Sequence, residues 1–120
     1  MINTNKASLQ PVKRIAVRIP SKMVEKIETN LLASGYNKKQ RLSWFEDVLA
    51  ELFEKDDFHN LIAEEFIEPG TTKTINLSLT VRTFDIVKKV VKEVEAQEDV
   101  KTDRSSVIRT AIIQRLLKKV

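Results

Sequence analysis

Two short stretches of the sequence carry hydrogen-bonding side chains at every second position. Residues 13–20 read KRIAVRIP and residues 74–79 read TINLSL, so apolar residues alternate with polar or small ones. This alternation predicts two β-strands, each with one buried and one exposed face. The exposed positions would be Arg14, Ala16 and Arg18 in the first strand and Thr74, Asn76 and Ser78 in the second. Arginine, asparagine, serine and threonine can hydrogen-bond to the edges of base pairs, whereas alanine can only contact a thymine methyl group.

The charge of the chain is unevenly distributed. The net charge is +4, but residues 44–70 contain nine of the 17 acidic residues and a single lysine, Lys55. The rest of the chain therefore has 20 basic and 8 acidic residues, a net charge of +12. Such segregation is typical of proteins that bind a polyanion, most often nucleic acid, although basic faces are also often simply solvated. We expect the acidic segment to form a solvated face that keeps nucleic acid away or binds a protein partner.

The composition argues against several other classes of protein. Cysteine is absent and His59 is the single histidine, so the sequence favours neither a metal site nor a histidine-dependent catalytic triad. His59 is expected to lie on the surface of the connector between the two halves. We expect no cofactor and no enzymatic activity. The sequence has no apolar run of membrane-spanning length and no signal peptide, which predicts a cytoplasmic protein without a membrane partner.

The predicted helices follow the strands in the same order twice. Apolar residues recur at helical spacing over residues 21–34 and 40–54 after the first strand, and over 81–97 and 104–118 after the second. Pro20 marks the start of the first helix, Thr80 that of the third and Asp103 or Thr102 that of the fourth. The expected organisation is a flexible arm (1–12), a first repeat (13–54), an acidic connector with a short helix (55–72) and a second repeat (73–120).

Aligning the two halves supports this repeat. An offset of 60 places Ile15, Val17, Ile19 and Val24 on Ile75, Leu77, Leu79 and Phe84, and an offset of 63 places Arg41 and Ser43 on Arg104 and Ser106. A single short strand leaves its backbone groups unpaired, so we expect the two strands to pair antiparallel over one shared core that includes Trp44 and Phe45. The fold class is therefore predicted as mainly α with a short two-stranded antiparallel β-ribbon.

The strand-helix-helix order, the IAVRIP strand ending in proline, and the basic or serine-rich start of the second helix resemble the ribbon-helix-helix family of DNA-binding proteins. Doubling within one chain is similar to the TraY-like proteins of conjugative plasmids. The resemblance implies a tandem pseudo-dimer, β-α-α-linker-β-α-α, whose paired strands enter the major groove of double-stranded DNA. The resemblance also implies which residues contact the bases: Arg14, Ala16, Arg18, Thr74, Asn76 and Ser78.

The resemblance also implies phosphate contacts at the start of each second helix. These would come from the backbone amides of Gln40, Arg41, Leu42, Arg104, Ser105 and Ser106 and from the side chains of Lys38, Lys39, Ser43, Lys101 and Ser106. Helix N-termini carry unpaired N–H groups and a partial positive charge, so this role is reasonable on physical grounds as well. Capping and solubility are equally good explanations for each lysine taken singly.

The resulting prediction is sequence-specific binding of double-stranded DNA, as a transcriptional regulator that can self-associate on adjacent sites. One alternative is an accessory DNA-binding protein of a plasmid relaxosome. Another is an antitoxin-type protein-interaction module whose acidic connector binds a protein partner.

Overall fold

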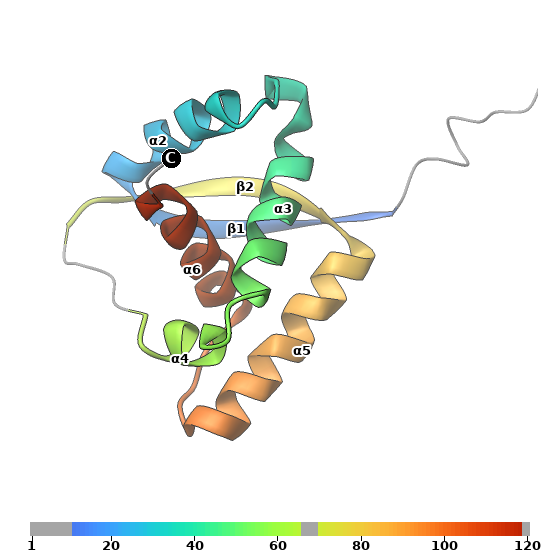
Figure 1. The fold of residues 1–120 in the computed structure, drawn as a ribbon, viewed down its shortest axis with the longest axis vertical. Helices are drawn as coiled ribbons and strands as arrows, with labels where there is room; N and C mark the ends of the chain where they lie inside the picture. Colours follow the sequence, from blue (N-terminus) through green and yellow to red (C-terminus); the bar gives the residue numbers. More distant parts are fainter. Residues whose placement is uncertain (1–10, 66–69, 119–120) are drawn as a thin grey trace, which may run out of the picture.

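The computed structural model describes residues 11–65 and 70–118 and is mainly helical with one two-stranded antiparallel sheet (Figure 1), as predicted. Along the chain, its elements are β1 (Val12–Pro20), α2 (Ser21–Ala33), the 3₁₀ turn η1 (Lys38–Gln40), α3 (Arg41–Phe53), α4 (Phe58–Ala63), β2 (Thr72–Thr80), α5 (Val81–Glu98) and α6 (Arg104–Leu117). The short helix α4 belongs to the connector, so the order is β-α-α-α-β-α-α. Residues 1–10 of the expected arm lie outside the described residues.

The two strands pair along their whole length. Val12 lies opposite Thr80 and Pro20 opposite Thr72, with Ala16 and Asn76 as the central pair. Because the halves align at an offset of 60, Ala16 and Asn76 are equivalent positions, and the register is symmetric about this pair. Alternate residues of both strands are buried, including Val17, Ile19, Leu77 and Leu79.

Several helix starts and ends have a local cause in the sequence. The Thr80 hydroxyl accepts from the amide of Thr83 at 3.3 Å, and Asp103 accepts from the amide of Ser106 at 2.8 Å, so both predicted N-caps are confirmed. Helix α2 follows Pro20 directly and ends before Gly35, whose φ of +93° is a conformation that glycine adopts without strain. Asn37 and Gln40 form a capping box around η1.

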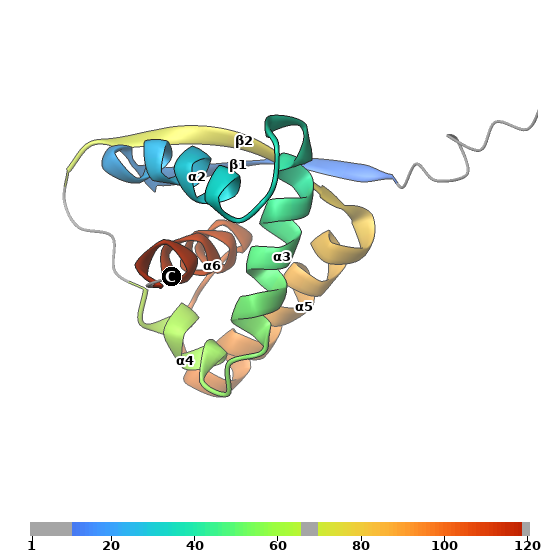
Figure 2. The same cartoon turned by 45° about the horizontal axis from the view of Figure 1, so that its top comes forward.

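The core lies between the inner face of the ribbon and the helices (Figure 2). Trp44 and Phe45 are buried, as predicted, and meet edge-on with their ring centroids 5.1 Å apart. The indole N–H of Trp44 donates to Asn30 Oδ1 at 3.2 Å, which satisfies the one polar atom of this side chain inside the core.

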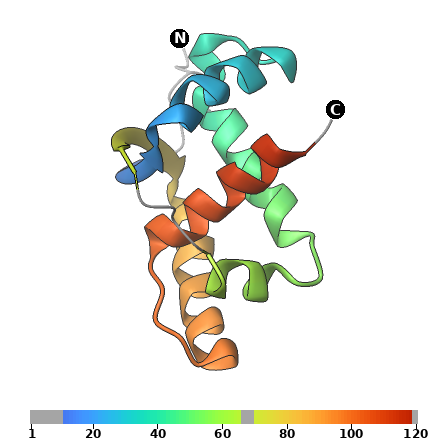
Figure 3. The ribbon, with the colours of Figure 1, turned by 90° about the vertical axis from the view of Figure 1, so that its left-hand side faces the viewer.

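Packing between the halves is crossed. Helix α3 packs against β2 and helix α6 packs against β1, while α3 and α6 also pack against each other, as Figures 2 and 3 show from two sides. Each second helix therefore covers the strand of the other half. One core cluster therefore includes residues from both halves of the chain.

Candidate nucleic-acid interface

The outer face of the ribbon gathers all six residues that the sequence marks as base-contacting. Arg14 lies opposite Ser78, Ala16 opposite Asn76 and Arg18 opposite Thr74, so the six residues form three successive cross-strand pairs. Ser78 is half-buried and the other five are exposed. Helices α3, α5 and α6 lie on the other side of the ribbon (Figure 2), which leaves this face open. The pairing thus brings together side chains that are about sixty positions apart in the sequence.

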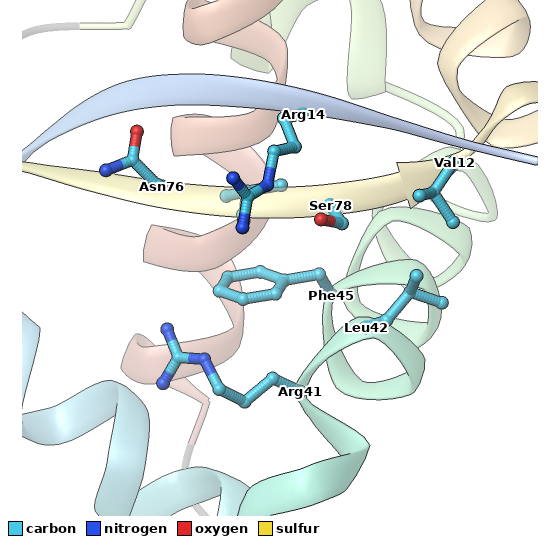
Figure 4. Close-up of a pocket in the computed structure, with 8 residues that line it drawn as sticks. Val12, Arg14, Arg41, Leu42, Phe45, Asn76 and Ser78 are labelled. Atoms are coloured by element: carbon cyan, nitrogen blue, oxygen red, sulfur yellow. The ribbon is translucent and has the colours of Figure 1, made fainter.

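A shallow groove of about 380 Å³ separates the ribbon from the start of α3. Figure 4 shows Arg14 extending across β2, between Asn76 and Ser78, with its guanidinium directed toward the Phe45 ring at the bottom of the groove. Arg41 lines the opposite wall, where it pairs with Glu28 at 3.2 Å. Two guanidinium groups therefore flank a depression beside the β2 edge of the ribbon.

Arg18 differs from Arg14 in its surroundings. One of its guanidinium nitrogens donates to Thr72 Oγ1 at 2.9 Å, along the exposed face of the ribbon. This contact orients the side chain and leaves its other N–H groups available, because arginine has five donors. The backbone carbonyl of Arg18 accepts from Arg109 Nη1 at 3.1 Å, so α6 supports the same residue from inside.

Two of the amides expected to bind phosphate are already engaged within the protein. The amide of Gln40 donates to the carbonyl of Asn37 at 2.9 Å, and the amide of Ser106 donates to the Asp103 carboxylate. Each of these two amides therefore already has an acceptor within the protein. The amides of Arg104 and Ser105 lie in the first turn of α6, where a helix supplies no internal acceptor.

The side chains at the starts of the second helices are mostly accessible. Lys38, Lys39, Gln40, Ser43, Lys101 and Arg104 are exposed, whereas Arg41, Leu42, Ser105 and Ser106 are half-buried. Gln40 Oε1 accepts from the amide of Asn37, and Ser106 Oγ accepts from Arg109. Ser105 Oγ donates to the carbonyl of Ala16 at 3.5 Å, which places the start of α6 beside the middle of β1.

The prediction that the acidic segment forms a solvated face is wrong for several of its carboxylates. Glu51 pairs with Arg115 and Lys118, and two others, Glu65 and Glu46, are held within the fold. The side chain of Glu65 is only 9% exposed, and it forms a two-pronged ion pair with Arg109, in which Nη2 is 2.8 Å from Oε1. Glu46 accepts from the amide and the hydroxyl of Thr80 at 2.8 and 2.7 Å. Both carboxylates hold parts of the fold that are distant in sequence, so neither is available to a partner.

Glu46 and Arg109 occupy the same position of the two repeats but carry opposite charges. At the end of β2, Thr80 has an N–H group that the Glu46 carboxylate can accept. The equivalent residue at the end of β1 is Pro20, which has no N–H. Near this end of β1, the Arg109 guanidinium donates instead to the backbone carbonyl of Arg18. We missed these residues in the sequence, although the charge reversal between aligned positions was a usable signal.

His59 also differs from the expectation of a surface residue. Its side chain is 20% exposed, its Nε2 lies 3.0 Å from Glu93 Oε1, and its ring stacks on Phe58 with centroids 3.9 Å apart. His59 therefore attaches α4 to α5.

Comparisons with family models, with curated proteins and with solved structures find no match to this chain. Within residues 11–65 and 70–118, no group of three or more histidine, cysteine or acidic side chains is arranged to hold a metal ion. No helix of that part of the chain is long and apolar enough to cross a bilayer.

Proposed function

We propose that this chain is a tandem ribbon-helix-helix pseudo-dimer that binds double-stranded DNA sequence-specifically by inserting its ribbon into the major groove. The observation that carries the proposal is the exposed face of the ribbon, on which Arg14, Arg18 and Asn76 lie with three smaller side chains in cross-strand pairs. A two-stranded ribbon fits the width of the major groove. Its side chains could then face the base edges while the helices remain outside.

The crossed packing supports the pseudo-dimer part of the proposal. In an intertwined homodimer, each subunit contributes one strand to a shared ribbon, and its symmetry axis passes through the centre of the pairing. Here the strand register is symmetric about Ala16 and Asn76, and each second helix packs on the strand of the other half. Such an arrangement is what joining two copies of a strand-helix-helix unit would produce.

The ribbon would read an asymmetric site, because its two strands differ. Arginine can donate two hydrogen bonds to guanine O6 and N7, and asparagine can pair with adenine N6 and N7. We therefore expect a guanine-containing portion contacted by Arg14 and Arg18 beside a portion with adenine or thymine contacted by Asn76 and its neighbours. A homodimer with identical strands would instead prefer a palindrome.

In vitro selection of bound duplexes from a random pool tests this proposal. Arg18→Ala and Asn76→Ala should each weaken binding to the selected site by about 1–3 kcal/mol and should relax preference at different base pairs. Lys39→Ala is the matched control, since loss of a phosphate contact should weaken all sequences alike. A palindromic optimum, or two variants that relax the same base pair, would contradict the asymmetric ribbon, and failure to select any duplex would contradict DNA binding.

Mapping the selected motif on the source replicon decides the biological role. We propose transcriptional regulation, for which the motif should lie beside a promoter. A motif beside a nicking site at a plasmid transfer origin would instead indicate an accessory protein of a relaxosome.

A further inference from the structure

Three cations from three different elements surround the ring of Phe84 near the start of α5. Lys13 Nζ of β1 lies 5.8 Å from the ring centroid, Lys88 Nζ of α5 lies 5.7 Å from it, and Arg104 Cζ of α6 lies 4.9 Å from it. All three distances are within the range of a cation–π contact. Phe84 itself is only 8% exposed, whereas the three cationic residues are exposed. We call these four residues the Phe84 cluster.

The cluster concentrates positive charge that ion pairs within the described part of the chain balance only in part. The one carboxylate paired with it there is Asp85, 3.7 Å from Lys88, and both of these side chains are more than half exposed. The electron-rich face of the ring attracts each cation, but their mutual repulsion remains because one ring carries no net charge. An anion placed among the three cations would relieve that repulsion.

The equivalent position of the first repeat is built differently. The repeat offsets align Phe84 with Val24, Lys88 with Glu28, Lys13 with Lys73 and Arg104 with Arg41. At this position Arg41 forms an ion pair with Glu28, with Nη1 3.2 Å from Oε2, and its guanidinium carbon lies 5.6 Å from the centroid of the Phe45 ring. The two edges therefore arrange their charge differently: three cations surround one ring at the Phe84 cluster, whereas the equivalent arginine of the first repeat is paired with a carboxylate.

The cluster lies beside the ribbon. Lys13 precedes Arg14 on β1, and Arg104 precedes Ser105, whose hydroxyl donates to the carbonyl of Ala16. Since α6 packs on β1 and α3 packs on β2, the Phe84 cluster flanks the β1 edge, while Arg41 and the 380 Å³ groove flank the β2 edge. In a major groove, the two edges of a ribbon face the two opposite phosphate backbones.

We propose that the Phe84 cluster binds the DNA phosphate backbone that faces the β1 edge, so that one strand of the duplex is held more tightly than the other. This inference rests on the proposed function. It adds that the phosphate contacts are divided unequally between the two DNA strands and that α5 contributes to them through Lys88. Ammonium and guanidinium groups both form strong charge-assisted hydrogen bonds to phosphate oxygens. Each of the three cations lies within 5.8 Å of the same ring centroid.

Salt dependence of binding by matched variants tests the proposal. The full chain and the variants Lys13→Gln, Lys88→Gln and Lys73→Gln are titrated onto one selected duplex at several salt concentrations. Each lost phosphate contact makes the slope of log K against log salt less steep by about 1. When salt rises from about 50 to 200 mM, the affinity of Lys13→Gln or Lys88→Gln should therefore fall by a factor about four times smaller than that of the parent. Lys73→Gln, the repeat counterpart of Lys13, should leave the slope unchanged. Equal effects of Lys13→Gln and Lys73→Gln, or no effect of the cluster variants, would overturn the inference.

A gain-of-contact variant and a chemical footprint complete the test. Glu28→Lys places a cation at the counterpart of Lys88 and releases Arg41 from its ion pair, so the slope should become steeper by about 1 or more. Phosphate ethylation interference with the parent chain should be stronger on one DNA strand, and Lys88→Gln should reduce that difference. Interference that is equal on both strands would refute the unequal division. Absence of duplex binding by the parent chain would refute the proposed function itself, which is a distinguishable result.

Discussion

Removing one member of the ion pair between Arg109 and Glu65 should be strongly destabilising, because both side chains are less than a tenth exposed and the remaining charge would stay buried. Replacing Arg109 by Met leaves the Glu65 carboxylate buried without its partner. Loss of one member of a buried pair costs about 3–5 kcal/mol, which is roughly a fifth or more of the stability of a typical small domain. Glu65→Leu should cost a similar amount, because it leaves the guanidinium unpaired.

The double variant Arg109→Met/Glu65→Leu separates the charge effect from the other contacts. It removes both charges, and the principal remaining loss is the hydrogen bond to the carbonyl of Arg18, about 1–3 kcal/mol for an unsatisfied buried acceptor. The double variant should therefore be more stable than either single variant, with a coupling energy of about 3 kcal/mol or more. Equilibrium unfolding in urea measures all three. Asp85→Asn, which disrupts an exposed pair, is the control and should change stability by less than about 0.5 kcal/mol. Single-variant costs below about 1 kcal/mol, or additive costs, would refute this reasoning.

Two further predictions concern the start of α6 and the division of the core. Asp103→Ala removes the acceptor of the Ser106 amide and should destabilise the chain by about 1 kcal/mol in the same urea assay, whereas Asp103→Asn, which keeps a capping oxygen, should cost clearly less. Residues 1–60 expressed alone lack β2 and α6, against which α3 packs, so this fragment should be unfolded or should form a homodimer. Sedimentation and circular dichroism distinguish both states from a folded monomer. A folded monomer would contradict a shared core.

Local patterns were sufficient to predict the regular elements of this fold. The alternation in KRIAVRIP and TINLSL marks both strands, and the structure extends each by only one or two residues at its ends. Thr80 was identifiable as one cap and Asp103 or Thr102 as the other, because a cap acts on an amide only a few residues away, and the structure shows that Asp103 is the cap. The antiparallel pairing followed from the need of each strand for a partner.

Long-range partners could not be predicted in the same way. The charge of residues 44–70 correctly suggested exposed carboxylates in general, but nothing local distinguishes Glu65 or Glu46 from their exposed neighbours. Their partners, Arg109 and Thr80, are 44 and 34 positions away. The Phe84 cluster is similar, because Lys13 and Arg104 converge on one ring only after β1 and α6 have packed together.

The wide spacing of the two strands has a consequence for how the chain folds. Even Arg18 and Thr72, near the closed end of the ribbon, are 54 positions apart. Closing a loop of that length costs about 3.5 kcal/mol in chain entropy, plus a constant, before any strand hydrogen bond forms. Helices form within about a microsecond, whereas long-range pairing is slow, so the rate-limiting barrier should be the meeting of the two halves. Since both halves belong to one polypeptide, the rate of that step should be independent of protein concentration, unlike the second-order assembly of two separate chains.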